Sequence, residues 1–208
     1  MKIMVLANWG LGVEILKVLH RMTDIDISVV ITRYVDNSKD VWENAVYDFA
    51  KTHGYPVLME TKVSFADIMN IAKEKNIDLI ICHSFMKIIP KELLDLPPKG
   101  VINVHASLLP KYRGPSPTYW LLKNKEKITG ITTHFMDQGI DTGPIIYQID
   151  VPVEIGDNIG SVIDKQKLVV QDLLQTTINR ILDPTFIPQK QNPALASFAP
   201  RPTQENNQ

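Results

Sequence analysis

Two polar side chains stand at the end of an apolar segment, in Gly100-Val101-Ile102-Asn103-Val104-His105. Residues two apart on a strand share a face, so we expect the Asn103 amide and the His105 imidazole on the same side. An amide donates hydrogen bonds and an imidazole exchanges protons near neutral pH. This pair is therefore suited to a reaction that needs hydrogen-bond donors and proton transfer. The same two residues could instead cap a strand end and form a hydrogen-bonded core histidine, and the pattern alone leaves both interpretations open.

Two loops add further candidates. Residues 106–117 follow His105 and hold three prolines and a glycine, which predicts a stiff loop able to shape a pocket. Residues 136–144 form a second turn-rich loop with two acids and two glycines, and Asp141 is its catalytic candidate. An aspartate in such a turn could also simply cap its own backbone. Pattern alone does not place Asp141 near His105.

Other chemistries are not supported by the spacing. Gly10-Leu11-Gly12 follows the first apolar run, but Ile15 stands where a dinucleotide-binding motif has its third glycine. The histidines show no metal-binding spacing, so we expect no metal. Ser107 lacks the sequence context of a catalytic serine.

These residues need a scaffold that brings strand ends together, and the apolar pattern predicts one. Several runs are apolar at every position, and segments with the spacing of amphipathic helices lie between them. This order is typical of a buried parallel sheet whose strands are connected by helices. We therefore predict an α/β fold, a doubly wound, Rossmann-like, mostly parallel sheet with helices on both faces. The expected strands are 2–7, 26–31, 77–82 and 100–104, and the expected helices include 41–53 and 64–75.

The pattern changes after Gly130. Residues 130–135 and 144–149 are strand-like and could extend the sheet as antiparallel strands, and 158–182 predicts one long helix. We expect residues 1–183 to form one domain. Residues 184–208 are rich in Pro, Gln and Asn and are interpreted as a tail or the start of a truncated C-terminal part.

Composition narrows the class of protein. The 208 residues carry a formal net charge of -1, so no general attraction to nucleic acid is expected. Cys82 is the single cysteine, which excludes an internal disulfide and favours a reducing compartment. The short apolar start predicts a first strand and neither a signal peptide nor a membrane span, so we expect a cytoplasmic protein.

Three segments together resemble the 10-formyltetrahydrofolate-dependent formyltransferases, a family that includes glycinamide ribonucleotide transformylase, methionyl-tRNA formyltransferase and the sugar N-formyltransferases. Residues 103–114 resemble its first signature, 137–144 its second, and 85–90 its folate-pocket loop. The order and spacing match over roughly residues 1–182. Residues 196–202 faintly resemble the segment after the catalytic domain in the tRNA and sugar branches.

The resemblance implies 10-formyltetrahydrofolate as cosubstrate and Asn103, His105 and Asp141 as catalytic residues, without a metal. Asn103 and His105 would donate hydrogen bonds to the oxyanion, and Asp141 would keep the imidazole protonated and relay protons. The implied cosubstrate contacts are Phe85, Met86, Lys87, Ile88, Ile89, Gln138 and Gly139. The implied acceptor contacts are Asn8, Trp9, Gly10, Ser107 and Arg113, although Trp9 could equally belong to the core.

The expected acceptor is a small primary amine, an amino sugar on a nucleotide. Residues 36–44 replace the basic insertion of the tRNA branch with three acids and one lysine, which disfavours a polyanion. The alternatives are methionyl-tRNA or glycinamide ribonucleotide as acceptor, a 10-formyltetrahydrofolate hydrolase, and, more remotely, a non-catalytic folate-binding relative. The oligomeric state is undetermined, and a homodimer is left open.

Overall fold

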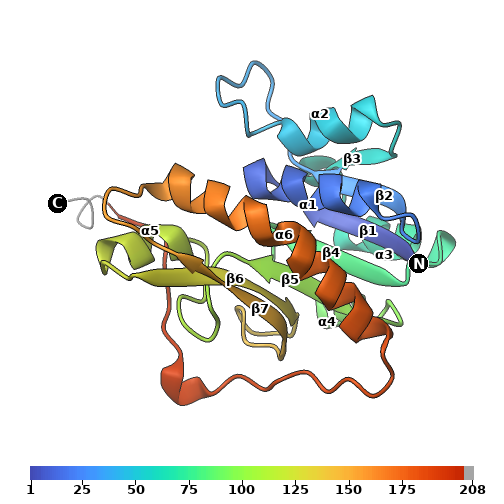
Figure 1. Ribbon diagram of the computed structural model, residues 1–208. Coiled ribbons are helices and arrows are strands. Elements are labelled where there is room, and N and C mark those ends of the chain that lie inside the picture. Colours follow the sequence, from blue (N-terminus) through green and yellow to red (C-terminus); the bar gives the residue numbers. More distant parts are fainter. Residues whose placement is uncertain (204–208) are drawn as a thin grey trace. The chain divides into compact units, whose positions relative to one another are not determined.

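The computed structural model of the protein describes residues 1–203 (Figure 1). The chain forms two compact units, Met1–Asn103 and Val104–Gln208. Strand β5 (Val101–His105) runs across the boundary between them, so that Asn103 ends the first unit and His105 belongs to the second.

The first unit is built on a parallel sheet. Its strand order is β3-β2-β1-β4-β5, and each neighbouring pair is parallel. The strands before β5 are β1 (Lys2–Ala7), β2 (Asp26–Thr32), β3 (Val57–Met59) and β4 (Leu79–His83). Every residue of β4 is buried, which explains why the apolar runs lack polar alternation.

Helices connect these strands on two faces. The chain moves outward from β1 to β3 and then returns to β4, so right-handed crossovers put the first two helices on one face and the next two on the other. These helices are α1 (Trp9–Arg21) and α2 (Ala45–Thr52), and α3 (Phe65–Glu74) and α4 (Lys91–Leu94), with the 3₁₀ turn η1 (Glu60–Lys62) before α3. The predicted fold class is confirmed.

Helix α2 starts later than the 41–53 predicted from spacing. The Asp40 carboxylate accepts a hydrogen bond from the Trp42 N–H at 2.9 Å, which closes a turn. The Asn44 amide then binds both the N–H and the carbonyl of Val35, at 2.9 and 2.8 Å. Side-chain hydrogen bonds to the local backbone compete with a helix, so residues 41–44 stay outside it.

The second unit holds an antiparallel pair, β6 (Ile128–Phe135) and β7 (Ile145–Pro152), as predicted. Helix α6 (Ile159–Leu182) packs on both strands and begins at a capping box formed by Asn158 and Ser161. Helix α5 (Pro117–Lys123), with proline in its first turn, occupies a stretch whose start was assigned to the loop.

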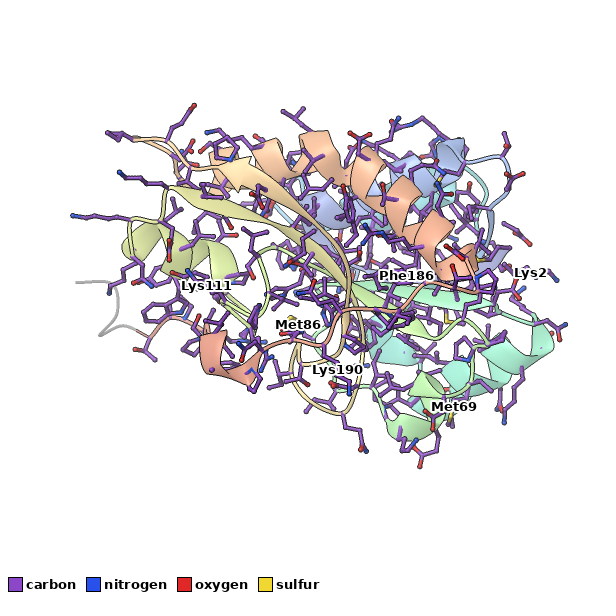
Figure 2. All side chains as sticks on the ribbon, turned by 60° about the horizontal axis from the view of Figure 1, so that its bottom comes forward. Lys2, Met69, Met86, Lys111, Phe186 and Lys190 are labelled. Carbon is purple, nitrogen blue, oxygen red and sulfur yellow. The ribbon has the colours of Figure 1, made fainter. Side chains whose placement is uncertain are left out.

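Residues 184–203, here called the strap, run along the second unit after α6 (Figure 1; Phe186 and Lys190 are labelled in Figure 2). The strap includes the 3₁₀ turn η2 (Pro193–Leu195). Gln189 exchanges two backbone hydrogen bonds with Ile145, at 2.8 and 2.9 Å, and Phe198 forms a β-bridge with Arg113. The sequence predicted a tail here, and its last residues, 204–208, lie outside the described part.

Candidate active site

His105 is the last residue of β5 and is only 6 % exposed. Its Nε2 lies 2.7 Å from the backbone oxygen of Tyr112. A carbonyl only accepts, so Nε2 carries a proton and donates it. Tyr112 has a left-handed backbone, with φ of 59°, within the proline-rich loop that follows β5. The ring's other nitrogen, Nδ1, is thereby directed toward Asp141, 3.5 Å from Oδ2.

Asp141 lies in the loop between β6 and β7, where its backbone φ is 52°. Its Oδ2 accepts a hydrogen bond from the Gly114 N–H at 2.8 Å, and Oδ1 lies 3.5 Å from Nε2 of His134. The carboxylate therefore stands between two imidazoles. The structure thus brings Asp141 and His105 together, which the spacing alone could not predict.

His134 is a residue that sequence reasoning missed. It is the penultimate residue of β6 and is 1 % exposed. Its Nδ1 donates to the Phe135 carbonyl at 2.8 Å, so the orientation of this imidazole is fixed in the same way as that of His105. The available signal was its place at a strand end just before the loop that carries Asp141.

The pKa values of Asp141 and His105 depend on burial and on the charged groups beside them. Burial would raise the pKa of Asp141, but His105, His134 and the Gly114 N–H together hold that pKa well below its usual range. Burial lowers the pKa of His105 from its ordinary value, the Asp141 carboxylate and the Tyr112 carbonyl oppose this effect, and His134 adds to it. Asp141 is therefore a stable anion at neutral pH.

Asn103 precedes His105 by two residues on β5, and its Cα pairs with that of Cys82 on β4. Its side chain is half-buried. Asn103 and His105 both lie on β5, two positions apart, and that they share a face stays the prediction made from the sequence.

The predicted cosubstrate residues lie in two loops. In the loop after β4, Ile89 is buried, Ile88 is 76 % exposed and Met86 is 48 % exposed (labelled in Figure 2), and Nζ of Lys87 donates to the Glu60 carbonyl at 2.6 Å. Phe85 belongs to the same loop and is half-buried.

The second loop contains Gln138 and Gly139. The Asp137 carboxylate shapes it by accepting bonds from the Gly139 N–H at 3.0 Å and from the Thr142 hydroxyl at 2.6 Å. Whether the two loops act together on one ligand stays a prediction.

Asn8, a predicted acceptor contact, is buried, and its amide is fully used. Its oxygen accepts from the Thr32 hydroxyl at 3.1 Å and the Arg33 N–H at 2.8 Å, and its nitrogen donates to Glu60 at 3.2 Å and to the Ser84 carbonyl at 3.0 Å. This side chain ties together three loops at the carboxyl edge of the first unit's sheet. An acceptor contact at this position would therefore use other groups.

The other predicted acceptor contacts differ in what their side chains do. Trp9 has a left-handed backbone with φ of 66°, and the Arg33 guanidinium lies 5.0 Å from its ring centre. Gly10 is buried in α1. The buried Ser107 hydroxyl donates to the Lys111 carbonyl at 2.8 Å and stabilises the loop.

Arg113 donates twice to the oxygen of the Gln191 amide, from Nε at 3.1 Å and from Nη2 at 2.6 Å. Gln191 belongs to the strap, and sequence reasoning did not single it out.

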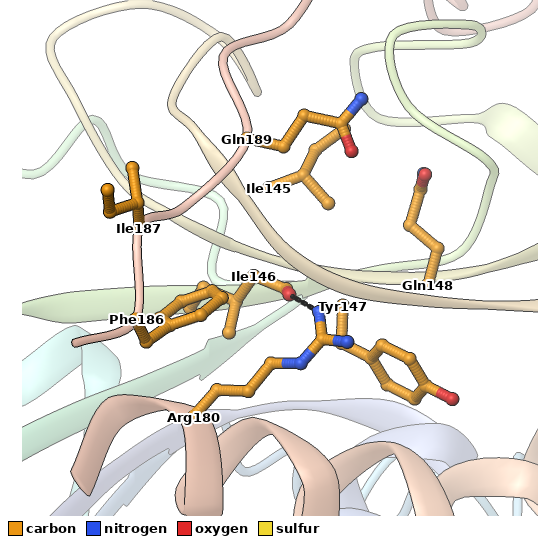
Figure 3. A pocket seen from close by; sticks show the side chains of 8 residues that line it. All are labelled: Ile145, Ile146, Tyr147, Gln148, Arg180, Phe186, Ile187 and Gln189. Atoms are coloured by element: carbon orange, nitrogen blue, oxygen red, sulfur yellow. Dashed lines mark hydrogen bonds between the residues drawn. The ribbon is translucent and has the colours of Figure 1, made fainter. Parts of the chain in front are cut away.

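A cavity of about 330 Å³ in the second unit is lined by none of the predicted site residues (Figure 3). Arg180 stacks against Tyr147 and Phe186 there and donates to the Ile146 carbonyl at 2.6 Å. Within residues 1–203, no cluster of three or more His, Cys, Asp or Glu side chains is arranged to hold a metal. Among the same residues, no helix has the length and apolar character needed to cross a membrane.

Comparison with known proteins identifies the family. Residues 1–178 match the family model described as formyl transferase, and the chain belongs to this family. A methionyl-tRNA formyltransferase of Citrifermentans bemidjiense is 40 % identical over 157 residues, which is 76 % of this chain and 49 % of the relative. That of Desulforamulus reducens is 41 % identical over 152 residues, 73 % of this chain and 48 % of the relative. The chain spans about half the length of these curated relatives.

Solved structures share the fold. A phosphoribosylglycinamide formyltransferase from Bacillus halodurans superposes with a TM-score of 0.73 at 25 % identity, over 88 % of this chain and 96 % of that chain. An N-formyltransferase from Helicobacter canadensis, in complex with folinic acid and dTDP-3-aminofucose, gives 0.73 at 23 % identity over 97 % of this chain and 71 % of that chain.

Proposed function

We propose that this protein transfers a formyl group from 10-formyltetrahydrofolate to a primary amine, with Asn103, His105 and Asp141 as catalytic residues. The observation that carries the proposal is the His105–Asp141 pair, with 3.5 Å between Nδ1 and Oδ2, at the end of the strand that also bears Asn103. The family supplies the reaction class.

The reaction needs oxyanion donors and a route for one proton. The amine nitrogen bonds to the formyl carbon, and the carbonyl oxygen becomes an oxyanion that the Asn103 amide and the protonated His105 ring stabilise. The bond from carbon to N10 of the folate then breaks. The attacking nitrogen loses a proton and N10 gains one, and Asp141 relays it through water.

The hydrogen bonds of His105 support this role. Because Nε2 donates to the Tyr112 carbonyl, Nδ1 is the nitrogen that can donate to the reacting oxygen. Asp141, 3.5 Å from Nδ1, is too distant for a strong hydrogen bond but close enough to favour the imidazolium ion. Asp141 can therefore support the charge without removing the donor from the substrate.

A rate assay tests this proposal. The purified protein is mixed with 10-formyltetrahydrofolate with and without an amine acceptor, and the folate product and the formylated amine are both measured. We expect amine-dependent formation of both products in equal amounts. Folate release without amine would instead indicate a hydrolase, and binding without turnover a non-catalytic relative; either result would refute the proposal.

Methionyl-tRNA has the stronger support as the acceptor, because the curated relatives described above are named methionyl-tRNA formyltransferases. A nucleotide-linked amino sugar is the second candidate. It is favoured by residues 36–44, where Asp36, Asp40 and Glu43 outnumber Lys39. Glu43 also pairs with Arg33 at 3.3 Å and so reduces the positive charge that phosphates would meet.

A panel of acceptors separates the two candidates. Initiator methionyl-tRNA, glycinamide ribonucleotide and amino-sugar nucleotides are compared by kcat/KM at one salt concentration. Preference for the tRNA with a steep loss of rate in higher salt is expected for the first candidate. Preference for the sugar with little salt dependence would select the second.

The remaining assignments are part of the same proposal. Residues 85–89, with Gln138 and Gly139, would contact the pterin, and Trp9 with Arg113 would lie on the acceptor side. We also propose residues 1–183 as the catalytic domain, followed from residue 184 by the Pro-, Gln- and Asn-rich segment that pairs with Ile145 and Arg113. A cytoplasmic location is part of the proposal, and the single buried thiol of Cys82 favours it.

A further inference from the structure

Gln191 of the strap makes four hydrogen bonds with its side-chain amide. Its oxygen accepts from Nε and Nη2 of Arg113, at 3.1 and 2.6 Å. Its nitrogen donates to the Asp141 carbonyl at 2.9 Å and to the Gly143 carbonyl at 2.7 Å. Gln191 lies beyond residues 1–178, which match the family model.

The chemistry of the neighbours allows only one orientation of this amide. A guanidinium group only donates and backbone carbonyls only accept, so the oxygen must face Arg113 and the nitrogen must face the loop. Glutamate would keep the contact with Arg113 but would turn a second acceptor toward two carbonyl oxygens. Glutamine is therefore matched to both sides of the contact.

The loop held by Gln191 has a backbone that needs such support. Asp141 is left-handed, a conformation that residues other than glycine adopt mainly where their surroundings hold them. Gly143 turns so close to β6 that an added Cβ would lie 1.9 Å from the Phe135 carbonyl oxygen. The two carbonyls bound by Gln191 flank Thr142, so one side chain holds both ends of this turn.

We propose that Gln191 is a positioning residue that holds the Asp141 carboxylate between the two imidazoles and couples this loop to Arg113. The proposal rests on the proposed formyl transfer. The groups that face the carboxylate include His105 from β5, His134 from β6 and the Gly114 N–H. Movement of the loop would change the distance to each of them.

Two variants separate the contacts of Gln191. Gln191→Met keeps the length and loses all four hydrogen bonds, whereas Gln191→Glu keeps the acceptor for Arg113 and loses both donors to the loop. Gln189→Met is the matched control, because Gln189 (labelled in Figure 3) is exposed in the same strap. Its backbone, which the substitution leaves in place, makes the hydrogen bonds to Ile145. Circular dichroism and thermal unfolding verify that each variant is folded.

Steady-state rates are measured from pH 5.5 to 9 with 10-formyltetrahydrofolate and the acceptor that the wild-type protein formylates. We expect both Gln191 variants to lose about 10-fold or more in kcat, with KM for the folate changed less, because positioning acts in the transition state. A displaced carboxylate supports the imidazolium less, so the decline of kcat with rising pH should begin at lower pH. The control should behave as the wild type.

A double variant tests whether the effect passes through Asp141. Adding Gln191→Met to Asp141→Asn should lower kcat no further than Asp141→Asn does alone. Independent, multiplicative losses would overturn the proposal, since they would mean that Gln191 acts elsewhere. A wild-type rate and pH profile in folded Gln191→Met, or in Gln191→Glu alone, would overturn it as well.

An NMR titration of the His105 imidazole needs no turnover. It therefore tests the positioning role of Gln191 independently of whether the protein transfers a formyl group. The pKa of His105 should be lower in Gln191→Met than in the wild type or in Gln189→Met. If the wild-type protein transfers no formyl group, the proposed function fails, and the titration shows whether Gln191 still positions Asp141. An unchanged pKa of His105 would refute the positioning role even in an active enzyme.

Discussion

Replacing Asp141 by asparagine removes one charge from the proposed site and little else. The asparagine oxygen can still accept from the Gly114 N–H, and the shape of the side chain is kept. The change therefore tests what the anion itself contributes to the protonation of His105.

The distance between the groups sets the size of the effect. Two unit charges 3.5 Å apart interact by about 5 kcal/mol at an effective dielectric constant of about 20. Burial lowers the pKa of His105 and the Asp141 carboxylate opposes this effect, so removing the carboxylate should lower that pKa further. Because each loss of about 1.4 kcal/mol of stabilisation is a factor of ten in rate, turnover that needs the imidazolium should fall by about 10²- to 10³-fold.

Initial rates from pH 5 to 9 provide the assay, with Asp150→Asn as the control. Asp150 is exposed on β7, so its substitution removes a charge without changing the cluster. In Asp141→Asn, kcat should keep rising as the pH falls, whereas the wild type should reach a plateau. A folded Asp141→Asn protein with kcat within about 3-fold of the wild type would refute the reasoning, as would an equal loss in the control.

Other perturbations test the remaining parts of the site and the fold. Asn103→Ala or His105→Ala should each lower kcat by about 10²-fold or more in a folded protein, and near-normal turnover in both would contradict their role as oxyanion donors. Ile88→Asp should weaken binding of a folate analogue, measured by titration, because it places a charge in an apolar contact; unchanged affinity would argue against this pocket. Gly130→Ala should reduce the free energy of unfolding by about 3 kcal/mol or prevent folding, because the new Cβ would lie 2.3 Å from a backbone oxygen and 2.4 Å from a leucine side chain; urea unfolding with an unchanged midpoint would contradict this. Hydrogen bonds to its carboxylate lower the pKa of Asp157 to about 2, so its stabilisation should be present above about pH 4 and decrease below it, as urea midpoints measured between pH 7 and 2 would reveal.

The sheet of the first unit could be predicted because its strands are buried on both faces. Strand β3 was missed because Val57–Met59 is three residues long and half-buried, so it shows neither an apolar run nor alternation. Helix α5 was assigned in part to a loop because the prolines before it are turn signals. Pro117 is also a common first residue of a helix, and only the packed structure distinguishes the two meanings.

The site was less predictable than the fold. The strand period was sufficient to pair Asn103 with His105, whereas Asp141 required the family resemblance. His134 has the spacing of an ordinary strand residue. Gln191 lies in a Pro-, Gln- and Asn-rich stretch typical of disorder, and its partner atoms belong to residues 78, 50 and 48 positions away. A local sequence pattern cannot predict contacts between residues so far apart in the chain.

The strap also has a consequence for the order in which the protein is made. Gln191 is synthesised 50 residues after Asp141, whose carbonyl it binds. At about 5–20 residues per second, the ribosome adds Gln191 roughly 3–10 s after Asp141. During that interval the nascent chain has His105, His134 and the turn around Asp141 but no amide to hold the turn. The loop of the proposed site is therefore expected to reach its final geometry only after the strap has been synthesised, when the parallel sheet has had time to form.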